Sequence, residues 1–159
     1  MRLLLATVVA APLWLFAAAA QTASDRHAGY YYPLPVTEET YVSRANELPR
    51  AGREMRLAFV VGLTQEQLAK PYAPSYAIFA KGDESEKLII VATGDGGFRT
   101  LYQARALLAQ LTTMARTTRL FQDLAVENVF TFFDLARLLG FDRITISDGE
   151  TFSHQITLE

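Results

Sequence analysis

The stretch YAIFAKGDESEKLIIVAT, at residues 76–93, is the clearest β-hairpin of the sequence. Two runs rich in aromatic and β-branched residues, 76–81 and 87–93, flank the polar turn 82–86. Residues 88–92, LIIVA, are apolar at every position. We therefore expect the second strand to lie at the centre of a sheet whose two faces are both covered.

The chain before this hairpin is expected to form two further strands and one short helix. Residues 38–46 favour a strand, although Thr37 followed by acidic residues could also begin a helix. Residues 55–62, MRLAFVVG, are rich in β-forming residues and end in glycine, so they predict a second strand. Thr64 and Gln67 have the spacing of a capping box, which predicts a short helix that ends before the next proline.

The chain after the hairpin is expected to form three helical segments. Apolar residues recur at helical spacing over residues 100–119, which predicts the longest helix. A short piece at 120–125 either continues this helix or bends away from it. Thr131 and Asp134 form a capping box for a last helix, and Gly140 is a suitable residue to end it.

The C-terminus predicts a second hairpin whose register can be derived. A three-residue loop at 148–150 pairs Ile146 with Phe152 and keeps the apolar side chains of both strands on one face. A two-residue loop would place these side chains on opposite faces. We therefore favour the three-residue loop, which puts His154 opposite Ile144.

This succession of elements predicts a single α+β domain over residues 36–159. Strands arrive in adjacent pairs, so the sheet should be mostly antiparallel, with helices packed on it. The chain has 159 residues and a formal net charge of −2, and half of its residues are apolar. This length suits one domain and excludes a multidomain machine, a polytopic membrane protein and a disordered chain.

Residues 1–20 have the pattern of an export signal. The basic start Met1-Arg2 is followed by an uncharged run of 18 residues that ends in three alanines, a motif that signal peptidases cut. We expect cleavage after Ala20 and a periplasmic protein that then has no membrane segment. An uncleaved segment would remain as an anchor. The sequence has no cysteine, so the exported fold is expected to be stable without disulfides.

Residues 21–35 are expected to be an extended leader that ends in an aromatic arm. Tyr30, Tyr31 and Tyr32 stand directly before two prolines, which favour extended chain and oppose a helix. Their rings can pin the arm to the domain. Alternatively, they form an exposed aromatic patch that binds a protein partner or a small ligand.

The composition argues against several classes of site. Two histidines and no cysteine supply few metal ligands, and the acidic turn at 82–86 lacks the spacing of a calcium loop. The mild negative charge argues against binding to nucleic acid or to anionic membranes. We expect no cofactor, no metal and no nucleic-acid partner.

Four arginines surround the turn at residues 49–53. They are Arg44, Arg50, Arg53 and Arg56. We interpret them as surface charge that nearby glutamates balance. A carboxylate-bearing partner that these arginines bind in bidentate pairs is the alternative.

Residues 94–99, GDGGFR, are a second candidate binding site. A strand, a glycine-rich turn and a helix N-terminus follow one another there, and this layout can bind a small anion through backbone N–H groups. Gly96, Gly97 and Arg99 would contact the anion, and Arg99 would offset the charge of Asp95. An ordinary turn is the alternative, because the glycines do not match a P-loop or a dinucleotide-binding motif.

His154 is the one candidate for acid–base catalysis. It would need a carboxylate beside it, for which Asp142 and Glu150 are the nearest choices in the sequence. Ser153 points to the opposite face of the same strand and cannot serve as a nucleophile activated by this histidine. A histidine held by hydrogen bonds at the edge of the core is the alternative.

Four stretches of the sequence resemble a known family. They are HAGYYYP (27–33), PYAPSYAIFAKGDESEKLIIVA (71–92), FTFFDLARLLGF (130–141) and ISDGETFSHQITLE (146–159). Together they resemble small exported proteins of alphaproteobacteria, whose members are sometimes labelled molybdopterin-guanine dinucleotide biosynthesis protein A. The resemblance implies export and supplies no catalytic residue, and the label implies nucleotide-related work on the molybdenum cofactor.

Three hypotheses about function follow from the sequence. The leading one is an exported accessory or binding protein without catalysis. The second is a small hydrolase-like enzyme that uses His154 with an acidic neighbour. The third is the molybdenum-cofactor role that the label implies.

Overall fold

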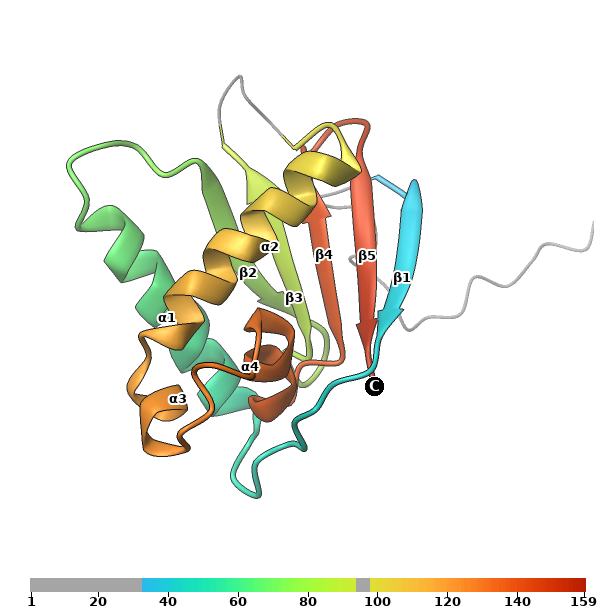
Figure 1. Cartoon of the computed structure of the whole chain (residues 1–159). Helices are drawn as coiled ribbons and strands as arrows, with labels where there is room; N and C mark the ends of the chain where they lie inside the picture. The colour runs from blue at the N-terminus through green and yellow to red at the C-terminus, as the bar shows by residue number, and fades with distance from the viewer. Residues whose placement is uncertain (1–32, 94–97) are drawn as a thin grey trace, which may run out of the picture.

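The computed structural model describes residues 33–93 and 98–159. These residues form a five-stranded sheet with helices packed against one face, and α2 runs diagonally across it (Figure 1). In chain order the elements are β1 (Thr37–Tyr41), α1 (Arg53–Leu68), β2 (Tyr76–Lys81), β3 (Lys87–Ala92), α2 (Leu101–Arg116), α3 (Arg119–Asp123), α4 (Phe132–Leu138), β4 (Arg143–Ser147) and β5 (Ser153–Leu158).

The five strands form a mixed sheet in the order β1-β5-β4-β3-β2. The pairs β2–β3 and β4–β5 are antiparallel, which confirms both predicted hairpins. β3 runs parallel to β4, and β1 runs parallel to β5. Parallel neighbours need a long connection, which α2, α3 and α4 provide between β3 and β4. The prediction of a single α+β domain with helices packed on a sheet is confirmed.

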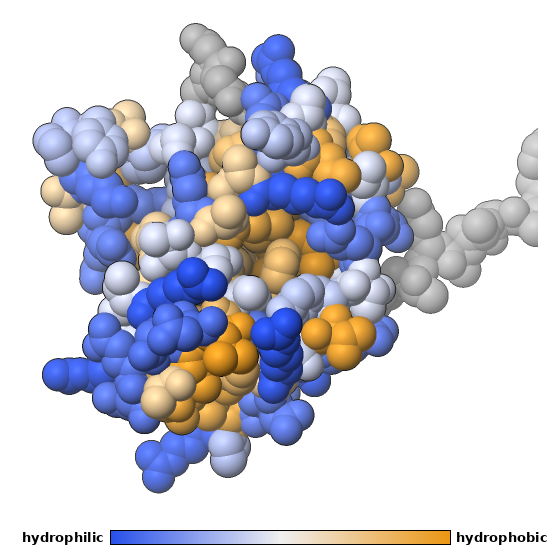
Figure 2. Space-filling view, in the orientation of Figure 1, coloured by the Kyte–Doolittle hydropathy of each residue, from blue (hydrophilic) through white to orange (hydrophobic). Residues whose placement is uncertain are grey.

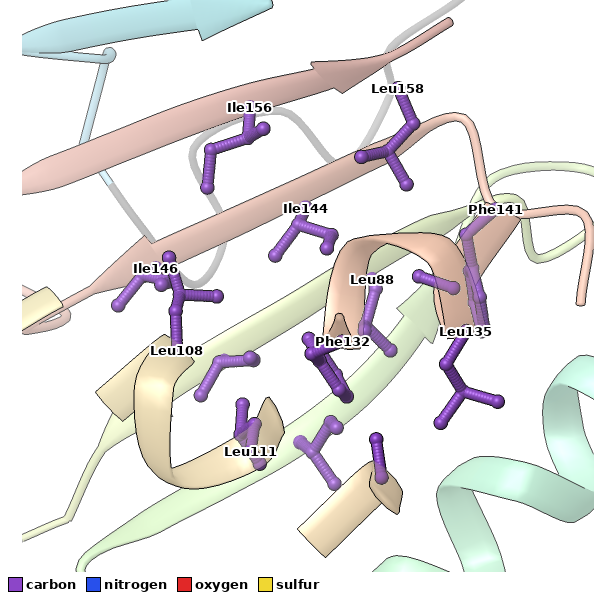
Figure 3. Close-up of a cluster of buried hydrophobic side chains, with 14 of the residues drawn as sticks. Leu88, Leu108, Leu111, Phe132, Leu135, Phe141, Ile144, Ile146, Ile156 and Leu158 are labelled. Carbon is purple, nitrogen blue, oxygen red and sulfur yellow. The ribbon is translucent and has the colours of Figure 1, made fainter. Parts of the chain in front are cut away.

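The hydrophobic core lies between the sheet and the helices (Figure 3). It combines alternate side chains of β3, β4 and β5 with the inner faces of α2 and α4. Its central members are Leu88, Leu108, Leu111, Phe132, Leu135, Phe141, Ile144, Ile146, Ile156 and Leu158. Burial of one such side chain stabilises a fold by about 1.5–3 kcal/mol, so this cluster holds the helical layer against the sheet.

The two capped helices after the first hairpin are confirmed. α2 follows Thr100, whose hydroxyl accepts a hydrogen bond from the backbone N–H of Gln103 at 3.3 Å. α4 follows Thr131, which forms the predicted capping box with Asp134. Gly140 lies just beyond α4 with a φ of 80°, a conformation that favours glycine. The short piece after α2 bends away as a separate helix, α3.

The strand predicted at residues 55–62 is wrong. The helix predicted after Thr64 is confirmed as helix that ends before Pro71, but its predicted start at Thr64 is wrong. These residues belong to one helix, α1, inside which the Thr64 hydroxyl donates to the carbonyl of Val60 at 2.9 Å. Phe59 and Leu63, four positions apart, both pack against the core. This helical spacing outweighs the β propensity of the segment, because tertiary packing overrides intrinsic preference.

The register predicted for the C-terminal hairpin is wrong by two residues. Ile146 pairs with His154 rather than with Phe152, so the loop is longer than three residues. The Asp148 carboxylate stabilises this wider loop by accepting hydrogen bonds of 2.8–2.9 Å from the backbone N–H groups of residues 150–152. Because the shift is even, the apolar side chains of both strands remain on one face.

The remaining strand predictions are largely confirmed. The strand expected at 38–46 corresponds to β1, which ends earlier, at Tyr41. β3 lies inside the sheet, between β2 and β4 and one place from the centre. Its residues Leu88, Ile89 and Ile90 are all buried, as the continuous apolar run predicts.

Candidate functional site

Most of the residues predicted to bind a ligand lie outside the described residues, as does the predicted signal at 1–20. They are Tyr30, Tyr31, Tyr32, Gly96 and Gly97. Arg99 is described: it is exposed just before α2, and its backbone N–H donates to Gln103 Oε1 at 3.1 Å. The aromatic arm and the glycine-rich anion site therefore stay predictions.

His154 lies in β5 and is only 1% exposed. Its neighbours on the adjacent strands are Thr37 of β1 and Ile146 of β4. Its Nδ1 atom lies 2.8 Å from the Thr37 hydroxyl oxygen and 3.2 Å from the Thr37 carbonyl oxygen. One side of the imidazole ring is therefore held by the edge strand β1.

The other side of the ring faces a carboxylate of the same edge strand. His154 Nε2 lies 3.3 Å from Glu39 Oε1, at ion-pair distance, without the alignment of a good hydrogen bond. The second oxygen of this carboxylate, Oε2, accepts a hydrogen bond of 3.1 Å from Arg105 of α2. Glu39 thus stands between a buried histidine and a surface arginine.

The carboxylates proposed from the sequence do not pair with His154. Asp142 is exposed and lies 3.4 Å from Arg137, and Glu150 is exposed in the β4–β5 loop. Glu39 could not be found from the sequence, because the Thr37–His154 contact joins residues 117 positions apart. No local pattern predicts that β1 pairs in parallel with the last strand.

A hollow of about 320 Å³ opens beside Glu39 and Arg105. We call it the β1–α2 hollow; its other lining residues are Leu108, Ala109, Thr112, Thr131 and Phe133. The Glu39 and Arg105 side chains are 34% and 60% exposed, whereas His154 is not among the lining residues. Solvent therefore reaches the carboxylate and the guanidinium but not the imidazole.

One wall of the hollow is fixed by the buried carboxylate of Asp134. This carboxylate accepts hydrogen bonds from Thr131 and Ser43, from the backbone N–H of Arg44, and from the Tyr41 hydroxyl. Burial alone would raise the pKa of Asp134, but these hydrogen bonds outweigh it and hold the pKa below the ordinary value. The network joins the chain after β1 to the start of α4.

Two other polar side chains, Ser147 and Arg56, have structural roles. Ser147 is buried, and its hydroxyl donates to the Phe152 carbonyl at 2.8 Å. Arg56, predicted as surface charge, is instead buried at 5% exposure, where it donates to the carbonyls of Glu84 and Gly140. Over residues 33–93 and 98–159, no three acidic or histidine side chains come together as metal ligands.

Comparisons with known proteins give no assignment. No protein-family model, no curated protein and no solved structure matches the chain. The resemblance to small exported proteins and the molybdenum-cofactor label therefore stay predictions. No helix in the described part of the chain has the length and apolar character needed to cross a bilayer.

Proposed function

We propose that this chain is an exported, periplasmic accessory or binding protein that acts without catalysis, and that the β1–α2 hollow is its binding site. The observation that carries the proposal is that one polar cluster has both solvent-exposed and buried members. Glu39 and Arg105 are open to solvent at the hollow, whereas His154 behind them is buried. Export is supported by the pattern of residues 1–20.

The position of His154 suits a supporting role better than acid–base catalysis. A general base must come within about 2.6–3.2 Å of the atom whose proton it takes. Both ring nitrogens of His154 face groups of β1, namely Thr37 and Glu39. We infer that the histidine orients the Glu39 carboxylate and secures the edge strand.

The chemistry of the hollow favours a ligand or protein segment that carries polar groups next to an apolar group. Arg105 offers free N–H donors, Glu39 offers acceptor oxygens, and Phe133 and Leu108 offer apolar surface. An exposed ion pair contributes only about 0–1 kcal/mol, so a bound partner can replace the Glu39–Arg105 contact at little cost.

Native mass spectrometry of the protein purified gently from its own host tests this proposal. The wild type is expected to carry an additional mass that the Arg105→Gln variant loses and that the Arg116→Gln variant keeps. Arg116 is a matched control because it is exposed on the same helix but lies outside the lining of the hollow. An additional mass that all three proteins retain would place the ligand elsewhere and overturn the proposed site.

The 3.3 Å contact between His154 and Glu39 supports one second candidate, the hydrolase-like enzyme. This enzyme would need a motion that opens His154 to a substrate. It predicts that the wild type hydrolyses simple aryl esters and that His154→Gln abolishes the activity while the fold is kept. Hydrolysis that depends on His154 in this way would replace the binding proposal.

A further inference from the structure

A second cavity lies within the helical layer, between α1, α2 and α4. It has a volume of about 190 Å³, and we call it the helix cleft. Its floor consists of Leu111, Ala115, Phe132 and Leu135, which are all 3% exposed or less. In the space-filling view, apolar surface is visible in the middle of the helical face, between hydrophilic side chains (Figure 2).

The walls of the helix cleft come from side chains that are only half-buried. Phe59 and Leu63 of α1 stand on one side, and Met114 of α2 stands on the other. Their inner surfaces contact the core while their outer surfaces remain open. A preformed apolar floor with adaptable walls, methionine among them, is typical of a site for a small hydrophobic group.

Among the residues that line the cleft, Glu66 is the charged one. The Thr117 and Thr118 hydroxyls already donate their single protons, to the carbonyls of Met114 at 2.8 Å and Ala115 at 2.6 Å, so towards a ligand they can only accept. Glu66 also lines the cleft, and its carboxylate has no hydrogen bond or ion pair with any described residue. The polar side chains that line the cleft therefore offer acceptors to a ligand, and Glu66 is the one among them that also attracts a cation.

We propose that the helix cleft binds a small molecule that combines one hydrophobic ring with an amine. The ring would occupy the cleft, and the ammonium group would lie against Glu66. A dry cavity of about 150 Å³ lined by apolar side chains is large enough for benzene, so a cleft of about 190 Å³ accommodates one ring but not two. This site is separate from the β1–α2 hollow and shares no lining residue with it.

Titration with 2-phenylethylamine, followed by NMR of the side-chain methyl groups, tests the inference on the exported protein. Saturable shifts are expected at Leu63, Met114 and Leu111, with a Kd of about 1 mM or tighter. Phenylacetate, which has the same ring with the opposite charge, should bind at least about fivefold more weakly. Glu66→Gln should weaken amine binding about three- to tenfold, whereas Glu54→Gln, at the other end of α1, should not.

Two matched variants test whether the ring enters the cleft. Leu63→Trp fills the cleft and should weaken binding at least tenfold. Val61→Trp adds the same side chain on the exposed side of α1 and should leave binding unchanged. Circular dichroism establishes whether each variant is folded. If Leu63→Trp does not fold, Met114→Trp is used in its place to fill the cleft.

The outcomes separate this inference from the proposed function. The affinity of Arg105→Gln for 2-phenylethylamine is expected to equal that of the wild type, because Arg105 lines the β1–α2 hollow and not the helix cleft. No methyl shift at about 10 mM amine would overturn the inference, since even a weak fragment would then be bound. Equal binding of amine and acid, or undiminished binding to a folded cleft-filled variant, would overturn it as well.

Discussion

Replacing Arg56 by methionine is expected to destabilise the fold by about 3–7 kcal/mol. Arg56 lies in α1, yet its guanidinium joins three elements that are far apart in the sequence. Its Nε donates to the Glu84 carbonyl in the β2–β3 turn at 3.0 Å, and its Nη1 donates to the Gly140 carbonyl beyond α4 at 2.9 Å. Only 5% of the residue is exposed.

The magnitude follows from these contacts. A hydrogen bond from a charged donor contributes about 1.5–3 kcal/mol, and Arg56 makes two of good length. The variant keeps much of the side-chain volume but leaves both carbonyls without this donor. It also removes a positive charge from the C-terminus of α4, which adds about 0.3–1 kcal/mol. In a domain of this size, where 1 kcal/mol shifts Tm by about 3 °C, the loss corresponds to a fall in Tm of about 10–20 °C.

Urea unfolding followed by circular dichroism measures this effect. Arg53→Met is the matched control, because Arg53 is exposed in the first turn of the same helix, and it should change stability by less than about 0.5 kcal/mol. Arg56→Lys should fall between the wild type and Arg56→Met, since an ammonium can replace only part of the guanidinium contacts. A loss below about 1 kcal/mol in Arg56→Met would refute the reasoning.

Three further predictions concern a buried carboxylate, a glycine with positive φ and a leucine of the hydrophobic core. Asp134→Asn should cost about 2–4 kcal/mol in urea unfolding at neutral pH, because an amide cannot accept as many hydrogen bonds as the carboxylate. The folded-state pKa of Asp134 lies below its ordinary value of 3.8. The contribution of this carboxylate to the free energy of unfolding is therefore complete above about pH 5, and it is lost as the pH falls through the ordinary pKa towards the lower folded-state pKa. The stability of the wild type should therefore drop more steeply than that of Asp134→Asn between about pH 5 and pH 3; parallel curves would contradict this. Gly140→Ala should lower Tm by several degrees, because φ is 80° there and the new Cβ would lie 2.5 Å from Arg56 Nη1. Leu111→Ala should cost about 2.7–5 kcal/mol, and a cost below about 1 kcal/mol would show that the core relaxes around the deletion.

Local signals in the sequence were sufficient for much of the fold. The turn between β2 and β3, the Thr100 cap of α2 and the Thr131–Asp134 capping box each act within a few residues. The parallel pairing of β1 with β5 has no such local signal, because the paired residues Thr37 and His154 are 117 positions apart in the sequence.

The wrong predictions concern features that are also determined by contacts between segments far apart in the sequence. The segment that forms α1 combines β-forming side chains with helical spacing, and packing against the core determines which prevails. The inner face of α1 carries Arg56, whose charge alone predicts a surface position although the residue is buried. The candidate site has no local signal for a related reason. Glu39 and Arg105 look like ordinary surface charges in the sequence, and only the pairing of β1 with β5 places Glu39 beside both His154 and Arg105.

Photo-crosslinking from inside the β1–α2 hollow tests the central claim most directly. A benzophenone amino acid would replace Ala109, which lines the hollow, or Gln110, which is exposed on the same helix but does not line it. After irradiation of the host cells, intact-mass analysis would show any adduct on the purified protein. The account predicts one defined adduct from position 109 and none from position 110. Equal adducts from both positions, or none from either, would contradict it.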